Sequence, residues 1–387
     1  MKLMKKLFLI LLALALTLCV ASCSNDEKKG EEAVETEKAA ANQNVFEDEN
    51  GSYEYQLNEE GKCEIVKYSP ASVKVIDVKL PKSLDDRDVV GIAASAFKAE
   101  NSIKSVTVPE TYTYVGDYAF YDCDSLTSVT FEGSAVTTIG DSAFEGCNAL
   151  ESINVPASVC AVGSFAFKDC VALKSIDLSG VKTLGNGAFL KCAALKTVTV
   201  TENISKISKN AFLGCDSLEY VAEGGALYLG GSANKFAVLV SAENLDIEAC
   251  KINDATTVIA DQAFLDCIYL KSVTVGKDVT TLSAACFENC PELEFNESEN
   301  GLYLGTAANP YAILMSVADQ TKEDFTLNPD VKILCDKAFA HYATLKDILF
   351  DGTKEEWEAI AKVDFWNNGR TVRVVFADAS IEPVIYN

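Results

Sequence analysis

Seven cysteines recur at one fixed place in a repeated string, and thiols are among the few side chains that bind metals, form disulfides or attack substrates. In "GDYAFYDC" (116–123) and "GDSAFEGC" (140–147) the cysteine stands three residues after a phenylalanine. The series is Cys123, Cys147, Cys170, Cys192, Cys215, Cys267 and Cys290. Steps of 22 to 24 residues separate most of its members. Catalytic groups do not recur in this way, whereas the core residues of a stacked repeat do.

The chemistry open to these thiols is limited. Fourteen cysteines are compatible with a disulfide framework in an exported chain. However, seven equivalent thiols in register cannot pair without breaking that register, and seven is an odd number. A metal site is disfavoured because the sequence has no C-x-x-C motif and a single histidine, His341. We therefore predict small, buried, free thiols, and Cys286, which occupies a column of alanines, fits the same description.

No other constellation indicates catalysis. The sequence lacks a G-x-S-x-G motif, a phosphate-binding glycine loop and metal-ligand spacing. His341 is predicted to be a surface residue, because the same column of other repeats holds Asp, Gly or Lys. The acidic runs "DDRD" (85–88) and "NESEN" (296–300) are interpreted as solvated loops, with weak Ca²⁺ binding as the alternative. We expect no enzyme, no cofactor and no metal.

The first residues have the features of an export signal. Three lysines precede a short apolar run, which is too short to span a bilayer. The run ends in "VASC" (20–23), which resembles a bacterial lipobox, and this resemblance implies that Cys23 is lipidated and becomes the mature N-terminus. The alternative is an ordinary signal cleaved near Ser22. We assign 1–22 to a lipoprotein signal peptide and 23–50 to an acidic, flexible tether.

The charge balance excludes some partners. The formal net charge is −24 and the pI is about 4.4. Nucleic acids and anionic membrane surfaces attract Lys/Arg-rich proteins. We therefore expect no nucleic-acid partner, and membrane attachment only through the N-terminal lipid.

The repeated phenylalanines define the elements that position the cysteines. We number each repeat from its phenylalanine as position 0, at Phe97, Phe120, Phe144, Phe167, Phe189, Phe212, Phe264, Phe287 and Phe339. Apolar residues recur at positions −5, +6 and +9, and the stretch from +6 to +11 alternates apolar and polar residues, as in "LKSIDL" (173–178). This alternation predicts one half-buried strand per repeat. Stacked repeats would join these strands into a parallel sheet.

The motif "VTTIGDSAFEGCNALESINVPAS" (136–158) resembles the BspA-type leucine-rich repeat, and the pattern covers residues 89 to 350. The resemblance implies a right-handed solenoid with a parallel strand on one face. It also implies a bacterial cell-surface protein, some relatives of which are adhesins for host-matrix glycoproteins.

The expected fold is an α/β leucine-rich-repeat solenoid, mostly β, with one parallel strand per coil. A hairpin-type N-terminal cap is assigned to 51–88, the repeats to 89–351 and a C-terminal cap to 352–387. The C-terminal cap is predicted to hold a short helix and a closing strand, and Thr353 with Glu356 forms a capping box at the start of the helix.

Two 52-residue steps interrupt the period, and the insertions that cause them, 224–253 and 299–328, are related in sequence. Each reads as a strand, a polar turn and a second strand, which predicts a hairpin that protrudes from, or caps, the coil beside it. Their aromatic residues are candidates for a ligand-binding patch, with packing of the hairpin onto the solenoid as the alternative. These candidates are Tyr228, Phe236, Tyr303 and Tyr311.

Together with the resemblance, these features predict a lipid-anchored, extracytoplasmic, adhesin-like protein of the bacterial envelope. It would be a monomer that presents its repeats to an extracellular protein, glycoprotein or glycan. The alternative is an envelope scaffold or a glycan-capturing surface protein. The polar strand positions are the candidate contact surface, here called the exposed strand row: Lys104, Ser105, Thr107, Glu151, Lys174, Ser175, Lys196 and Thr197.

Overall fold

The structure is a computed structural model that describes residues 44–336, 338–340, 342–363, 366–367, 371–378 and 380–384. The predicted signal peptide, Cys23, most of the predicted tether and His341 lie outside these residues. The chain from Asn44 onward forms a single compact unit. Its first strand, β1 (Asn44–Glu47), pairs with the second, so ordered structure begins inside the segment that was predicted to be a tether.

The N-terminal cap is built from antiparallel strands, as predicted. The strand β2 (Gly51–Leu57) pairs antiparallel with β1 and with β3 (Cys63–Pro70). On its other side, β3 pairs parallel with β6 (Arg87–Ile92), which begins the stack of coils. The remaining strands of the cap are β4 (Ile76–Lys79) and β5 (Ser83–Leu84). The cap therefore covers the first coil with paired strands.

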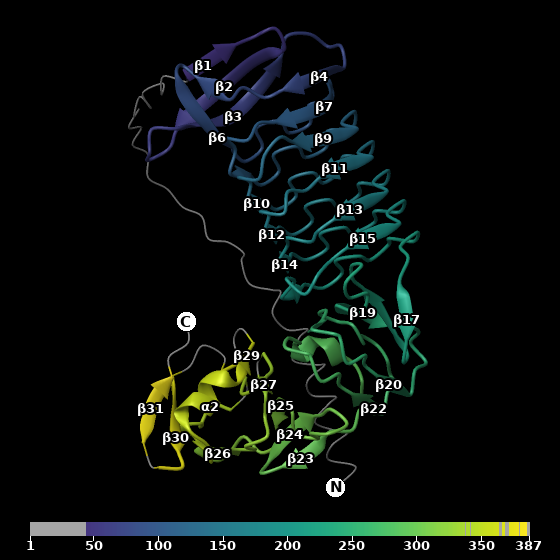
Figure 1. Ribbon diagram of the computed structural model, residues 1–387, viewed down its shortest axis with the longest axis vertical. Helices are drawn as coiled ribbons and strands as arrows, with labels where there is room; N and C mark the ends of the chain where they lie inside the picture. Colours follow the sequence, from purple (N-terminus) through teal and green to yellow (C-terminus); the bar gives the residue numbers. More distant parts are fainter. Residues whose placement is uncertain are drawn as a thin grey trace, which may run out of the picture. The chain divides into compact units, whose positions relative to one another are not determined.

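Each repeat forms one coil of a mostly-β solenoid, named here by its phenylalanine. In seven of the nine repeats the predicted strand pairs parallel with a strand of an adjoining coil, so that Ile153 lies beside Val129 and Ile176 beside Val198. These strands are β7 (Ile103–Val108), β9 (Ser128–Phe131), β11 (Ser152–Asn154), β13 (Ser175–Asp177), β15 (Thr197–Thr199), β22 (Ser272–Thr274) and β28 (Asp347–Phe350). In the Phe212 and Phe287 repeats the predicted strand pairs antiparallel with the insertion that follows. Figure 1 shows β7 to β15 stacked one upon the next.

Most coils also have a second, two-residue strand that the sequence did not predict. It contains the apolar residue at −5, which is buried between coils. The first five are β8 (Tyr114–Val115), β10 (Thr138–Ile139), β12 (Ala161–Val162), β14 (Thr183–Leu184) and β16 (Lys206–Ile207). They continue the sheet of the N-terminal cap into the longest sheet of the protein. Two residues are too few to show the alternation that identifies a strand in sequence.

The turn around Ala-Phe explains the small and polar residues that surround this pair. Positions −2 and +2 have left-handed φ angles in successive coils, including +57° at Tyr118 and +56° at Asp122. Asn, Asp and Gly tolerate this region best. In this conformation three backbone N–H groups of one coil, at positions −2, 0 and +2, donate hydrogen bonds to the next coil. Their acceptors are the backbone carbonyls at positions −3, −1 and +1 of that coil, as when Phe120 donates to Ala143 at 2.7 Å. We call these three hydrogen bonds the turn ladder. It is complete at every step from the Phe97 coil to the Phe212 coil.

The core is a column of stacked rings. From Phe97 to Phe212 each phenylalanine stacks on the next, with centroids 4.9 to 5.6 Å apart and interplanar angles of 2° to 17°. A second stack joins Phe264 and Phe287, 5.2 Å apart. The break between the two stacks coincides with the first insertion.

The first insertion contains the predicted hairpin but does not simply protrude. The strand β17 (Val221–Glu223) turns back into β18 (Ala226–Leu229), which pairs antiparallel with β19 (Val238–Ala242). The strand β19 then pairs parallel with β21 (Val258–Ile259), and β20 (Ala249–Lys251) pairs parallel with β22. The end of the insertion is therefore a further coil of the stack. The prediction of a protruding or capping hairpin missed this continuation.

The second insertion repeats this arrangement. The strands β23 (Asn296–Ser298), β24 (Gly301–Leu304) and β25 (Ile313–Val317) are antiparallel, and β25 pairs parallel with β27 (Ile333–Leu334). The strand β26 (Asp324–Leu327) pairs parallel with β28. The coil that precedes it differs, because its turn contains the short 3₁₀ helix η2 (Ala284–Phe287).

The C-terminal cap has the predicted helix and strand. The helix α2 (Lys354–Ala359) begins with both hydrogen bonds of the predicted capping box, between Thr353 and Glu356. Trp357 and Trp366 are buried and pack edge to face, with centroids 5.8 Å apart. The last strands are β29 (Ala361–Lys362), β30 (Val372–Phe376) and β31 (Ile381–Val384).

Candidate binding surfaces

The ladder cysteines are buried structural residues, which confirms the prediction. All seven have less than a tenth of their surface exposed. Six of them place the sulfur within 3.0 to 3.1 Å of the carbonyl oxygen of the phenylalanine in the preceding coil, to which the thiol donates. The pairs are Cys123 with Phe97, Cys147 with Phe120, Cys170 with Phe144, Cys192 with Phe167, Cys215 with Phe189 and Cys290 with Phe264. The recurring cysteine thus contributes one weak hydrogen bond between coils.

Burial also makes these thiols poor nucleophiles. It raises the pKa of Cys290 and of the neighbouring column residue Cys286 to about 12, because the apolar interior disfavours the thiolate. Burial raises the pKa of Cys170 further for the same reason. Within the described residues, no group of three or more His, Cys, Asp or Glu side chains could hold a metal ion. The buried cysteines therefore provide packing rather than reactivity.

The aromatic residues of the two hairpins do not form the predicted patch. Tyr228 and Tyr303 are fully buried, and their hydroxyl oxygens accept hydrogen bonds from the backbone N–H groups of Asn253 and Asn328, each at 3.2 Å. The prediction that these two tyrosines contact a ligand is corrected, because neither ring reaches the surface. They pack each hairpin onto its coil, which was the alternative.

The other two candidates are half-buried partners of these tyrosines. Phe236 meets the ring of Tyr228 edge-on at 5.4 Å, and Tyr311 meets that of Tyr303 at 5.7 Å. The Nζ atom of Lys235 lies 4.8 Å above the Phe236 ring. Phe236 and Tyr311 therefore keep some access to solvent and remain candidates for ligand contact.

The exposed strand row faces solvent, although Ser105 and Thr107 are half-buried. Charged members of the row pair with an adjoining coil: Lys174 with Glu151 of the preceding coil at 2.6 Å, and Lys196 with Glu219 of the following coil at 3.2 Å. The lysine lowers the pKa of Glu151 through its hydrogen bond. These solvated pairs add little to stability, since exposed ion pairs are screened. The row is thus a surface of mixed charge, repeated at each coil.

A comparison with protein families agrees with this architecture. A sequence model described as the BspA type leucine rich repeat region matches residues 90–219 and 241–307 in six copies. The chain belongs to this family. A comparison with curated proteins gave no match.

Solved structures similar to this BspA-type chain are leucine-rich-repeat proteins. A leucine rich cell surface protein from Faecalibacterium prausnitzii is 22% identical, with 82% of this chain and 97% of that chain covered and a TM-score of 0.41. A leucine-rich repeat protein from Bacteroides ovatus is 20% identical, with 86% and 99% covered and a TM-score of 0.38. The leucine-rich repeat protein of T. pallidum is 22% identical, with 62% and 87% covered and a TM-score of 0.35.

Sequence reasoning missed a group of exposed aromatic residues on the turn side of the BspA-type coils. Tyr118 and Phe165 are 43% and 39% exposed, and both occupy the left-handed −2 position, at φ values of +57° and +58°. The Nζ of Lys98 lies 5.8 Å from the Tyr118 ring, and that of Lys168 lies 5.8 Å from the Phe165 ring. The sequence did contain a signal for these residues: a bulky aromatic ring stands at position −2, where other repeats have Ser, Gly or Asn. The left-handed φ angle of this position is unfavourable for a bulky residue.

No helix within the described part of this BspA-type chain is both long enough and apolar enough to cross a membrane.

Proposed function

We propose that this BspA-type chain is a non-catalytic, adhesin-like binding protein of the bacterial cell surface, which holds an extracellular protein or glycoprotein along the exposed strand row. The observation that carries the proposal is the division of side chains within each coil. The thiols are buried and bonded between coils, whereas the polar strand positions face solvent at a fixed interval. A long, repeated surface of this kind suits an extended macromolecular ligand.

Attachment to the membrane is proposed to occur through a lipid on Cys23. The support is the sequence "VASC" at the end of the signal-like segment. The acidic residues that follow would act as a spacer between the lipid and the coils. Metabolic labelling with a fatty-acid analogue should mark the natural chain and not a Cys23→Ser variant. Equal labelling of both chains would contradict the proposal.

A glycan-capturing surface protein is the second candidate. It is supported by the exposed rings of Tyr118 and Phe165, because exposed aromatic faces offer contact area at low entropic cost. An envelope scaffold differs from both in its partners, which would be other proteins of the same cell.

The test is a binding screen of the mature chain against arrayed matrix glycoproteins and polysaccharides at about 0.15 M salt, where exposed charges are largely screened. Saturable binding to a protein supports the adhesin-like role, and binding only to polysaccharides supports glycan capture. A chain that is folded but binds neither class contradicts both, and pull-downs from the envelope then test the scaffold.

A matched pair of variants locates the surface. The double change Lys174→Glu with Lys196→Glu alters the exposed strand row and should weaken binding at least tenfold. Lys182→Glu with Lys206→Glu makes the same change in charge on the −5 side of the coils, beside β14 and in β16, and should leave binding unchanged. Equal losses in both variants would indicate that net charge, and not the row, governs binding.

A further inference from the structure

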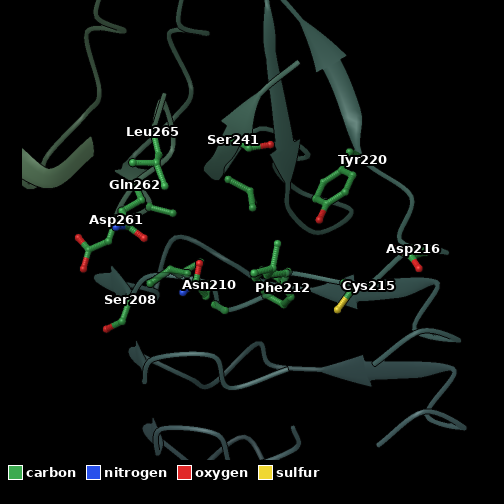
Figure 2. Close-up of a pocket in the computed structure, with 16 residues that line it drawn as sticks. Ser208, Asn210, Phe212, Cys215, Asp216, Tyr220, Ser241, Asp261, Gln262 and Leu265 are labelled. Atoms are coloured by element: carbon green, nitrogen blue, oxygen red, sulfur yellow. The ribbon is translucent and has the colours of Figure 1, made fainter. Parts of the chain in front are cut away.

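A cavity of about 380 Å³ opens between the Phe212 coil and the Phe264 coil, where the first insertion interrupts the stack. Figure 2 shows Asn210 and Phe212 on one wall, Asp261 and Leu265 on another, and Tyr220 reaching in from the β17 side. The volume is within the range of small-ligand sites. The cavity is therefore large enough to hold more than solvent.

One wall of the cavity carries the free end of the turn ladder. The N–H groups of Asn210, Phe212 and Gly214 have no hydrogen-bond partner among the described residues. In the preceding coil, the N–H groups of Gly187 and Phe189 donate at 3.0 and 2.8 Å to carbonyls of the Phe212 coil. All three residues with unpaired groups line the cavity. The wall thus presents three backbone donors with alternate-residue spacing.

The opposite wall carries the complementary acceptors. In a regular step, the carbonyls at −3, −1 and +1 of the later coil accept from the turn ladder. In the Phe264 coil these are the carbonyls of Asp261, Ala263 and Leu265. The N–H of Ala242 donates to Ala263 at 2.7 Å, but no described residue donates to the carbonyls of Asp261 and Leu265. The cavity therefore has unpaired donors on one side and unpaired acceptors on the other.

A short coil is the physical origin of this gap. Leu239 aligns with Ile259 and Cys250 with Val273, so the insertion supplies positions −5 and +9 of an extra coil. Eleven residue steps separate Leu239 from Cys250, whereas fourteen separate Ile259 from Val273. The extra coil is therefore three residues too short between positions −5 and +9, where a regular coil forms its Ala-Phe turn. A complete turn there would fill the cavity and pair with the turn ladder of the coil on either side.

The lining of the cavity defines the chemistry of its ligand. No Lys, Arg or His lines it, whereas Asp216 and Asp261 do, so phosphate and carboxylate ligands are disfavoured. Backbone donors and acceptors on facing walls match the two edges of a peptide main chain. The rings of Phe212 and Tyr220 supply apolar contact area.

We propose that this cavity binds a short peptide segment that adopts the turn conformation of the missing residues. Its carbonyls accept from Asn210, Phe212 and Gly214, and two of its N–H groups donate to Asp261 and Leu265. The inference goes beyond the proposed function, because the cavity does not include the exposed strand row. A failure of either proposal leaves the other standing.

The test measures hydrogen exchange by mass spectrometry in the mature chain. The probe is the blocked peptide acetyl-GNGAFLK-amide, which copies the turn 185–191. In the free chain, the amides of Asn210, Phe212 and Gly214 should exchange fast, whereas Gly187, Phe189 and Lys191 are protected by the turn ladder. Saturating probe should slow exchange of the amides of Asn210, Phe212 and Gly214 at least tenfold and leave 185–193 unchanged. The same peptide N-methylated at its second glycine and its lysine lacks two donors and should bind at least tenfold more weakly.

A matched pair of variants places the probe in the cavity. Leu265→Trp fills the cavity from position +1 and should abolish protection by the probe. Leu190→Trp makes the same change at position +1 of the Phe189 coil, outside the cavity, and should retain it. The proposal is overturned if the amides of Asn210, Phe212 and Gly214 are already protected in the free chain, if about 1 mM probe gives no protection, or if Leu265→Trp is still protected. Protection by cellobiose but not by the peptide would replace the peptide with a neutral sugar.

Discussion

The Sγ atom of Cys147 lies 3.1 Å from the carbonyl oxygen of Phe120 in the preceding coil, and both residues are fully buried. The same carbonyl accepts a second hydrogen bond, from the backbone N–H of Cys123 at 3.3 Å. The thiol is therefore a small apolar side chain that also satisfies part of a buried carbonyl. Alanine would fill less of the space and donate nothing, so the contact explains why cysteine recurs in this column.

Removing this thiol should destabilise the protein. We expect Cys147→Ala to lower the free energy of unfolding by about 1–2 kcal/mol, through lost volume and one lost weak hydrogen bond. Cys160→Ala is the control, because Cys160 is half-exposed, and it should change the value by less than about 0.5 kcal/mol. Urea denaturation under reducing conditions measures both. Equal effects would show that the column position has no special role.

Alkaline pH should weaken the fold. Burial raises the pKa of Cys250 and Cys286 to about 12, whereas a thiol in the unfolded chain has a pKa of about 8.5. Each such thiol contributes its full stabilisation to the fold when the pH is below its pKa in the unfolded chain. This stabilisation is lost, by about 1.4 kcal/mol per pH unit, as the pH rises towards its pKa in the folded chain. Denaturation curves at a series of pH values should show this loss. Cys286→Ala, which restores the alanine of other coils, should make the decline shallower, and an unchanged slope would contradict the assignment.

Gly224 should tolerate no side chain. Its φ is +62°, and a Cβ atom there would approach the carbonyl oxygen of Lys251 to 2.2 Å, so Gly224→Ala adds a backbone clash to the left-handed strain. Gly61 has a similar φ of +74° and open space around it. We expect about 1 kcal/mol of destabilisation for Gly61→Ala and roughly 3 kcal/mol or more for Gly224→Ala. Thermal denaturation would contradict this expectation if the two variants had the same melting temperature.

The capping box should stabilise the C-terminal cap. Thr353 accepts from the backbone N–H of Glu356 at 3.2 Å, and the Glu356 carboxylate accepts from the Thr353 N–H at 2.8 Å. Thr353→Ala should cost about 1 kcal/mol, and Thr353→Ser should cost much less because it keeps the acceptor. Fluorescence of the buried Trp357 follows the unfolding of this cap. Alanine and serine variants of equal stability would show that the box contributes nothing.

The regular part of the fold could be predicted because its residues repeat a pattern. Leu150 and Ile153 take core positions in one coil as Leu173 and Ile176 do in the next, and a strand of alternating character follows from that spacing. The second strand was not predictable, since Thr138–Ile139 is too short to alternate. Its pairing depends on neighbouring coils and not on local sequence.

The insertions show a different limit. Two strands and a polar turn were predictable from residues 224–243, because each element has a local signal. That β19 continues the stack could not be predicted, because this depends on its parallel pairing with β21, which no residue type encodes. The burial of Tyr228 follows from the same docking. The cavity beside Phe212 was missed for a related reason: a deficit of residues is visible only when the register of both neighbouring strands is known.

The turn ladder gives each pair of neighbouring coils a defined number of backbone hydrogen bonds. Each step up to the Phe212 coil adds three backbone hydrogen bonds between neighbours, and the step that follows lacks them. In a protein held together only by nearest neighbours, the weakest step limits cooperativity. Residues on the two sides of this step should therefore unfold as separate units. The step after the Phe287 coil, at the second insertion, also lacks these bonds among the described residues. Under tension between its ends, the chain should therefore open first at one of the two insertions, while the coils from Phe97 to Phe212 remain folded.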